Sequence, residues 1–325
     1  MHSSPETASS CQSVFHARWG GLRDPHVRAL AWLIDSPDLL NPGALQWRGR
    51  IASMPRAGSD ATRSWLLALD LEPASLHARL HLTPFTRLGR YAETLVGFYL
   101  EHLGLLAAQG MPVRDGKSRT IGEFDFLLNM PAGLVHWEFA SKLYLLETSG
   151  QGQHVDYFVG PNLADTLGAK IGKVLDRQLK LAEHPSATAC LPQPVVSAQA
   201  LIKGWLFYRD DNCRQAEELG VSPEHCRGFW CPYGELDKVQ AEAFFILPRL
   251  QWLAPASIAR SQAMTAGQLK VVLKEKFEHD SMPVLIACLQ RSGEALLEQQ
   301  RGFIVPDDWQ VRAGLRARRT DAQDS

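Results

Sequence analysis

The sequence predicts an α/β fold in which helices pack against a mixed β-sheet. Two segments of alternating apolar and polar residues, 120–128 and 134–146, indicate a pair of strands joined by a turn at 129–133. Apolar residues at helical spacing before and after this pair indicate flanking helices. The expected core elements are a helix from Thr83-Pro84 to about 103, strands at 105–113, 120–128 and 134–146, a helix at about 163–182 and a strand at 200–208. This order of helix, three strands, helix and strand makes an α/β sandwich.

Segments outside this core are shorter and less regular. Asp24-Pro25 predicts the cap and first turn of a helix, and a second short helix is expected at 61–69, after a loop at 40–60. Beyond the core we expect one or two strands within 243–253, a helix at 266–277 and a strand at 283–289. The expected divisions are a disordered tail at 1–13, an N-terminal helical extension at 14–82, the core at 83–212, a C-terminal α+β region at 213–313 and a frayed tail at 314–325.

The composition is that of a soluble globular protein. Of the 325 residues, 45% are hydrophobic and 21% are charged, and no apolar segment reaches the ~18 to 20 residues of a membrane span. The N-terminus lacks the apolar segment of a secretory signal, so a cytoplasmic protein with reduced cysteines is expected. A net charge of −1 argues against a broadly basic surface, so any phosphate binding must come from a local patch.

The two central strands gather charged residues on one face. Because side chains alternate along a strand, Phe124, Phe126, Leu128, Val135, Trp137, Phe139 and Leu143 are expected on the apolar face. The opposite face is expected to carry Glu123, Asp125, His136, Glu138, Ala140 and Lys142. Two carboxylates on adjacent strands suit a hard cation such as Mg²⁺ or Mn²⁺, and a nearby lysine can stabilise developing negative charge. The residues alone leave open a solvated strand face with a cross-strand Glu–Lys pair.

The hairpin resembles a known nuclease motif. Gly122-Glu123-Phe124-Asp125, followed by a strand with Glu138 and Lys142, is similar to the G-x-x-D…E-x-K signature of the PD-(D/E)XK nuclease superfamily. This resemblance implies that Asp125 and Glu138 bind a metal ion and that Lys142 serves the chemistry. The superfamily lysine falls two residues after the Glu, where this chain has Ala140. Lys142 lies ~6.6 Å further along the same face, so its side chain would have to fold back across Ala140.

The whole chain is also similar to a bacterial family, domain of unknown function 1853. The resemblance is carried by Ala31-Trp32-Leu33-Ile34, the hairpin at 122–142, Gly160-Pro161-Asn162 and 301–306. It implies a nuclease-like core and no established activity.

A glutamate on the helix before the hairpin extends the resemblance. The superfamily places a Glu there, and Glu93 fits that position, with Gly89 and Gly97 four residues to either side. Glycine costs roughly 1 kcal/mol in a helix relative to alanine, and a close approach of the helix to the sheet would offset this cost. Alternatively, Glu93 pairs with Arg90 or Arg87 on a helix that only packs tightly.

The later helix carries a buried glutamine and a basic ridge. Gln178 falls within the apolar stripe, where its amide either reaches the site or substrate, or caps a buried backbone group. Lys170, Lys173, Arg177 and Lys180 are spaced to form a ridge along which a phosphate backbone could lie. The alternative is a solvated face with Asp176 nearby.

These observations favour a Mg²⁺- or Mn²⁺-dependent phosphodiesterase that acts on nucleic acid, with DNA as the expected substrate. Asp125, Glu138 and Glu93 would bind the metal, Glu123 would support them, and Lys142 would stabilise charge. The chain lacks a G-x-x-x-x-G-K-[ST] phosphate loop and a G-x-S-x-G elbow, and its cysteines do not form the duplicated pairs of a structural zinc site. Two alternatives stay open: a non-catalytic module with the nuclease fold that binds or scaffolds, and hydrolysis of a small phosphorylated substrate.

Overall fold

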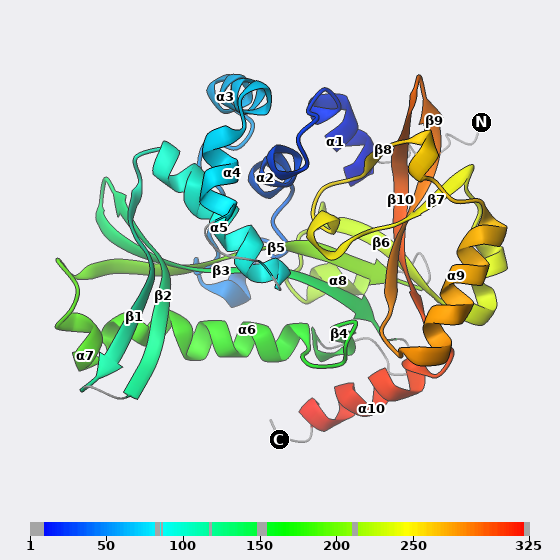
Figure 1. Ribbon diagram of the computed structural model, residues 1–325. Coiled ribbons are helices and arrows are strands. Elements are labelled where there is room, and N and C mark those ends of the chain that lie inside the picture. The colour runs from blue at the N-terminus through cyan, green and yellow to red at the C-terminus, as the bar shows by residue number, and fades with distance from the viewer. Residues whose placement is uncertain are drawn as a thin grey trace, which may run out of the picture.

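The molecule is built on one large mixed sheet with helices on both faces (Figure 1). The computed structural model describes residues 10–81, 85, 87–116, 119–147, 155–209 and 214–321. The strands are β1 (Leu106–Asp115), β2 (Arg119–Met130), β3 (Gly133–Leu146), β4 (Phe158–Val159), β5 (Val195–Tyr208), β6 (Cys226–Pro232), β7 (Ala243–Ile246), β8 (Ser257–Ala259), β9 (Val284–Ser292) and β10 (Ala295–Val305).

The α-helices are α1 (Cys11–Trp19), α2 (Pro25–Asp35), α3 (Asp60–Leu71), α4 (Ala74–His81), α5 (Leu88–His102), α6 (Leu167–Asp176), α7 (Pro185–Thr188), α8 (Arg214–Glu218), α9 (Ala266–His279) and α10 (Trp309–Asp321). Short 3₁₀ helices are η1 (Leu45–Trp47), η2 (Val155–Tyr157), η3 (Gln178–Glu183), η4 (Tyr233–Lys238), η5 (Arg249–Gln251) and η6 (Arg260–Gln262).

The strand order explains why the sheet is mixed. The main path runs β1-β2-β3-β5-β6-β10-β9-β7. Parallel pairs join β3 to β5, β5 to β6 and β6 to β10, whereas antiparallel pairs form both ends. The predicted α/β class and the predicted order of helix, three strands, helix and strand are confirmed by α5, β1, β2, β3, α6 and β5. The strands of the expected C-terminal region continue the same sheet through the β5–β6 pair.

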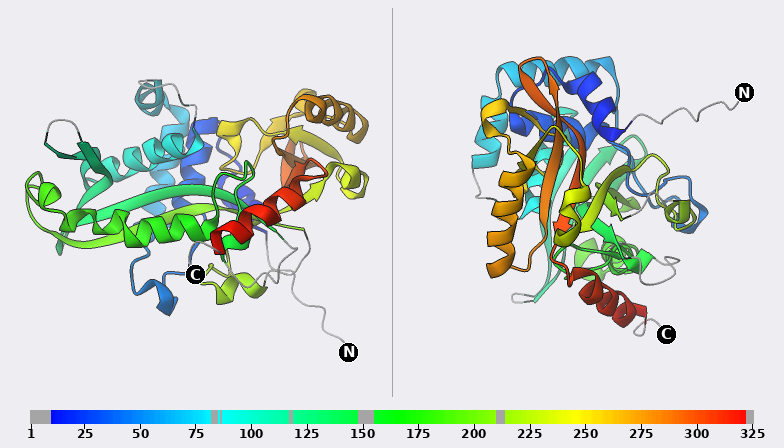
Figure 2. Two further views of the ribbon diagram at one scale, coloured as in Figure 1. Left: turned by 90° about the horizontal axis from the view of Figure 1, so that it is seen from below. Right: turned by 90° about the vertical axis from the view of Figure 1, so that its right-hand side faces the viewer.

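Two apolar layers sandwich the sheet (Figure 2). On one face, α1 to α5 pack on the sheet and bury residues such as Trp32, Leu95 and Trp205. On the other face, α6 and η3 bury Ile171, Val174 and Leu179 against Ala140 and Ile202. A separate cluster lies under α9 at the far end of the sheet. The central strands β3 and β5 are therefore buried on both sides, as parallel pairs usually are.

Several predicted boundaries are wrong. Thr83 and Pro84 lie outside the described residues, and the helix expected to begin there begins at Leu88. The helix expected at 163–182 is α6 followed by η3: Leu163 has a positive φ of 60°, and Arg177, at φ −123° and ψ −59°, interrupts the α-helix. Within 243–253, where one or two strands were expected, β7 forms and ends at Ile246, and Pro248 and η5 follow.

Both expected tails contain helix. Residues 11–13 begin α1, which is held by the buried Phe15 and Trp19. α10 continues through 314–321, with Ala317 and Trp309 buried. The sequence reading also missed α4, β6 and β10. The helices at Pro25 and at 61–69 are confirmed as α2 and α3, and Asp24 caps α2 by accepting from the N–H groups of His26 and Val27.

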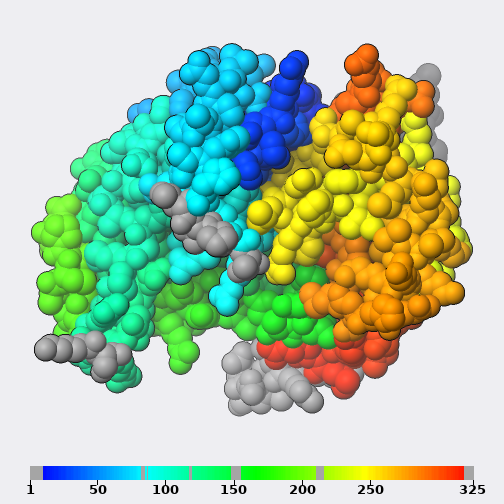
Figure 3. Space-filling model, in the orientation of Figure 1, coloured from blue at the N-terminus to red at the C-terminus, as the bar shows by residue number. Residues whose placement is uncertain are grey.

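The N-terminal and C-terminal parts of the chain meet on the face shown in Figure 3. Blue and cyan residues of the N-terminal helices adjoin yellow residues of the segment before β8, where α5 contacts η5. Within the described part of the chain, no helix has the length and apolar character that crossing a membrane requires.

Candidate metal centre

The candidate centre lies where β2 and β3 separate. The two strands pair only from Phe126↔Trp137 to Met130↔Gly133 among the described residues. Beyond Trp137, β3 continues against β5, while β2 stays with β1. Asp125 is the residue just before the paired segment, and its Oδ2 accepts a hydrogen bond of 2.9 Å from the Phe139 N–H. The carboxyl group therefore sits in the fork between the strands, tied to the backbone of β3.

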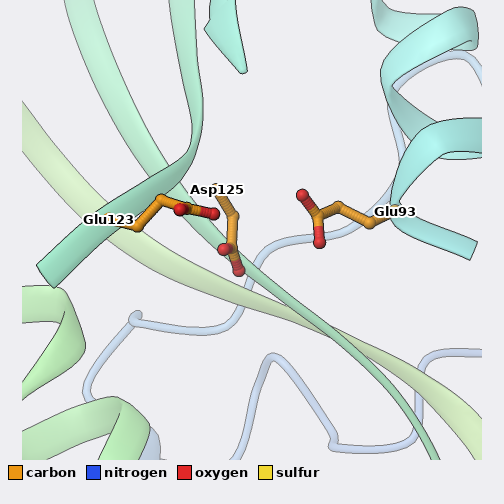
Figure 4. A group of neighbouring side chains, drawn as sticks. All are labelled: Glu93, Glu123 and Asp125. Carbon is orange, nitrogen blue, oxygen red and sulfur yellow. The ribbon is translucent and has the colours of Figure 1, made fainter. Parts of the chain in front are cut away.

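Three acidic side chains meet at this fork. Glu93 from α5 and Glu123 and Asp125 from β2 each offer a carboxylate oxygen, and these oxygens lie within 4.8 Å of one another. Figure 4 shows Glu123 and Asp125 extending from β2 and Glu93 reaching toward them from the helix. Glu93 is only 9% exposed. The structure thus brings Glu93, which the sequence placed on the preceding helix, to the acids of the hairpin.

Glu138 joins this group from the other side of the fork. Besides burial, the charge of its carboxyl raises the pKa of Asp125, although Glu138 lies outside the set of three. His136 Nε2 lies 3.1 Å from its Oε1, and Gln178 Nε2 donates to its Oε2. The carboxyl of Glu138 is 1% exposed and is fixed by partners on both oxygens. Asp125 therefore lies between Glu93 and Glu138.

Burial and mutual repulsion raise the pKa of these acids. Burial raises the pKa of Glu93 to about 7, with repulsion from Asp125 adding to it. Burial, and then the charge of Glu138, raise the pKa of Asp125 to about 7. Burial also raises the pKa of Glu138 to about 7, against the opposing effect of Lys170. Near neutral pH the group shares protons, which a cation could displace.

Arg90 is the counter-ion of the group. From α5, its Nη1 lies 3.0 and 3.1 Å from the two oxygens of Glu93, and its Nη2 lies 3.0 Å from Glu123 Oε1. Glu93 lies with the acids of the hairpin and also pairs with Arg90, although the sequence offered these as alternatives. The guanidinium is more than half exposed, so it can leave the acids without unfolding the helix.

Lys142 pairs with a carboxylate outside the candidate centre. Its Nζ lies 2.6 Å from Asp165 Oδ2, and the Tyr144 hydroxyl donates to the same oxygen at 3.2 Å. A side chain folded back across Ala140, as expected from the sequence, is therefore not observed. The reason is local, because Asp165, placed just before α6, offers Lys142 an opposite charge directly.

Lys170 is the lysine that lies beside the acids. It reaches from α6, and its Nζ donates to Gln178 Oε1 at 3.3 Å. Its positive charge lowers the pKa of Glu138 and of Asp125, and burial lowers its own pKa. Gln178 thus bridges Lys170 and Glu138 and reaches the site rather than a backbone group. The sequence had placed Lys170 only in the basic ridge.

The remaining ridge residues are exposed but do not form one helical line. Lys173 lies on α6, Arg177 interrupts the helix, and Lys180 lies in η3. The expected spacing of three, four and three assumed an unbroken α-helix, which is wrong. All three remain exposed along the segment from α6 to η3 that also carries Lys170 and Gln178.

Two further expectations about the hairpin and its helix are corrected. Phe124 does not share a cluster with Phe126: it packs with Leu127 and, edge-on at 4.7 Å between ring centroids, against His136. The expected sharing of one cluster by Phe124 and Phe126 is therefore wrong, at the point where β2 is paired with β1 but not with β3. A Cβ on Gly97 would collide with the Gln109 side chain of β1, which is the expected close approach, whereas one on Gly89 would meet open space.

His136 was missed as a site residue. It is fully buried, burial lowers its pKa to about 4, and its Nε2 shares a hydrogen bond of 3.1 Å with Glu138 Oε1. The remaining nitrogen, Nδ1, has no hydrogen-bond partner among the described groups. The sequence held one sign of this role: the alternation along the strand placed His136 on the same face as Glu138.

A comparison with family models identifies the chain. The model described as domain of unknown function (DUF1853) matches residues 28–305. The chain belongs to the DUF1853 family. The DUF1853 match runs from α2 to the last residue of β10 and includes every residue of the candidate centre. Comparison with curated proteins and with solved structures gives no significant match.

Proposed function

We propose that this DUF1853 protein is a Mg²⁺- or Mn²⁺-dependent phosphodiesterase that hydrolyses nucleic acid, with DNA as its substrate. The observation that carries the proposal is the cluster of Glu93, Glu123 and Asp125 from α5 and β2. Glu138 of β3 and Lys170 of α6 lie close enough to act on the charge of Asp125. The hairpin motif and the order of elements resemble the PD-(D/E)XK nucleases and support this reading.

The donor set fits a hard cation. Every candidate ligand is a carboxylate oxygen, which is what Mg²⁺ and Mn²⁺ prefer. The acids are largely buried, and Arg90 offsets the charge of Glu93 and Glu123 only. Asp125, hydrogen bonded to the Phe139 N–H and set between Glu93 and Glu138, would be the central ligand. When bound, the cation would supply Lewis-acid polarisation of a phosphoryl oxygen and a more acidic bound water.

The protein's own side chains would position the metal ligands and neutralise the charge of the phosphate. His136 and Gln178 hold the two oxygens of Glu138, so this ligand is fixed before substrate arrives. Lys170, kept near the acids by Gln178, would stabilise negative charge that develops on phosphate, the role that the resemblance assigned to Lys142. Lys173, Arg177 and Lys180 would contact the phosphate backbone, which gives affinity without sequence selection.

The test is hydrolysis of DNA and RNA panels with Mg²⁺ or Mn²⁺. We expect metal-dependent cleavage that Asp125→Ala and Glu138→Ala abolish. Lys170→Ala should lower kcat roughly 10²- to 10³-fold, as loss of one charge-stabilising group does. Lys142→Ala is the matched control and should cost far less. Cleavage that survives both acid substitutions would refute the assignment, and cleavage of RNA alone would refute DNA as the substrate.

One observation favours a second candidate function. Arg90 already bridges Glu93 and Glu123, so the acids have a counter-ion within the protein. This arrangement suits a nuclease-like fold that binds nucleic acid without cutting it. Calorimetric titration with Mg²⁺ and Mn²⁺, with and without DNA, separates the two functions. Absence of metal affinity together with absence of cleavage would favour the binding module.

A further inference from the structure

A cavity of about 610 Å³ lies between α1 and the segment that enters β6. Its lining includes Cys11, Phe15, Trp32, Asp35, Cys226 and Arg227. None of its lining residues belongs to the candidate metal centre. The cavity holds two thiols that no part of the proposed function uses.

The two thiols are neighbours. Both line the same cavity, and the Cys226 thiol is the group with the largest effect on the pKa of Cys11. The Cys11 thiol itself donates to the Glu224 backbone oxygen at 3.8 Å. Cys11 is partly exposed at the cavity, whereas Cys226, the first residue of β6, is 1% exposed. The pair therefore combines one partly exposed thiol with one that is almost fully buried.

The surroundings of Cys11 favour its thiolate. It is the first residue of α1, and the positive end of a helix stabilises an anion there. The Cys226 thiol and the charges of Arg227 and Arg301 lower its pKa, whereas burial raises the pKa of Cys226. Cys11 is thus the more nucleophilic sulfur, and Cys226 is placed to act as the resolving thiol.

Helix α1 is fixed well enough to keep this arrangement. The buried Gln12 donates to Glu298 Oε1 at 3.5 Å, and His16 Nε2 lies 2.9 Å from the Glu298 backbone oxygen. Phe15 and Trp19 are buried beneath the helix. Cys11 therefore stays over the start of β6 rather than sampling solvent.

We propose that Cys11 and Cys226 form a peroxide-oxidation site that closes to a disulfide between α1 and β6. Hydrogen peroxide transfers one oxygen to the Cys11 thiol, which becomes a sulfenic acid while one water leaves. The Cys226 sulfur then attacks the Cys11 sulfur; the S–S bond forms as the S–OH bond breaks, and the hydroxyl leaves with the Cys226 proton as a second water. Two thiols lose two electrons in total, and one peroxide is reduced to two waters.

The experiment treats the full-length reduced protein with hydrogen peroxide, alkylates the remaining thiols and maps peptides without reduction. We expect a Cys11–Cys226 linked peptide, which a dithiol reductant removes, at peroxide levels that leave most of Cys190 alkylated. Cys190 is the matched control because it is exposed and lies far from both sulfurs in the sequence. Full alkylation of Cys11 and Cys226 after Cys190 has been oxidised would overturn the proposal.

A variant tests the order of events. In Cys226→Ala, Cys11 should accumulate as a sulfenic acid that a 1,3-dione reagent traps at least tenfold faster than Cys190. Equal or slower trapping of Cys11 would overturn the assignment of Cys11 as the attacked sulfur. The wild-type peptide map decides the proposal even if this variant is unstable.

Discussion

Arg90 competes for the same acids that a cation would bind. Its guanidinium neutralises Glu93 and Glu123, so metal entry must displace it or share the acids with it. We predict that Arg90→Gln raises affinity for Mn²⁺ roughly threefold to tenfold, the range expected when a partly exposed ion pair is removed. Calorimetric titration measures this. Arg87→Gln removes the same charge one turn away and should leave the affinity unchanged; equal gains in both variants would point to net charge alone.

The raised pKa values of the acids predict a dependence of stability on pH. Glu93, Asp125 and Glu138 keep protons up to about pH 7 in the fold, whereas unfolded carboxyls lose them near pH 4. Between these values the folded state binds more protons, so stability falls as pH rises and the loss is complete above about pH 7. His136 and His225, whose pKa values are lowered to about 4, make stability rise with pH below pH 6.5. The effect of the acids therefore has to be measured against a matched variant.

Asp125→Asn supplies that variant, because it holds one member of the group permanently uncharged. In the absence of metal we expect it to raise Tm over the wild type at pH 8 and to leave Tm nearly unchanged at pH 5. Thermal unfolding followed by circular dichroism measures both. A stabilisation of equal size at both pH values would show that repulsion among the acids is not its cause.

Among the elements, α5 sets how closely Glu93 approaches the hairpin. Gly97 packs on Gln109 of β1, which itself donates to the Glu93 backbone oxygen at 3.3 Å. Gly97→Ala should push aside the flexible end of the Gln109 side chain, so it should forfeit the stabilisation of about 1 kcal/mol that alanine gives a helix and weaken metal binding. The Cβ that Gly89→Ala adds would point into open space, so this variant should stabilise the helix by up to about 1 kcal/mol. Denaturant unfolding checks both, and equal changes of stability in the two variants would contradict this packing.

The sequence predicts those elements whose residues alternate in polarity or whose cap is clear. β3 alternates although it is buried on both faces, because one face carries the polar residues of the candidate centre, and α2 has a clear cap in Asp24. β10 escaped prediction because Glu298 and Arg301, both fully buried, interrupt its apolar pattern. The sequence predicted Lys170 as a phosphate contact but not its position beside Glu138, because that position depends on how α6 lies across the sheet, which no local spacing encodes.

At the scale of the whole molecule, one buried ion pair joins distant parts of the chain. Arg301 Nε lies 2.6 Å from Glu298 Oε1, and the guanidinium also donates to backbone oxygens of Leu253 and Ala254. Glu298 in turn accepts from the Ala256 N–H and from Gln12 of α1. These contacts connect β10, the segment before β8 and the N-terminal helix.

Glu298→Gln should lower the free energy of unfolding by about 3 to 5 kcal/mol, because it leaves the charge of Arg301 buried without a counter-ion. Urea unfolding measures the loss. Asp280→Asn breaks the exposed pair with Lys276, 40% exposed on each side, and should cost less than about 1 kcal/mol. Equal losses in the two variants would mean that burial does not set the cost.

The position of β10 has a consequence for how the chain folds during synthesis. β10 fills the place between β6 and β9, although it follows both in the sequence. Until residues 295–305 leave the ribosome, β6 presents an unpaired edge that another nascent chain can extend. The sheet therefore completes only once residues 295–305 are available, and folding of this protein is expected to be slow and late rather than progressive from the N-terminus.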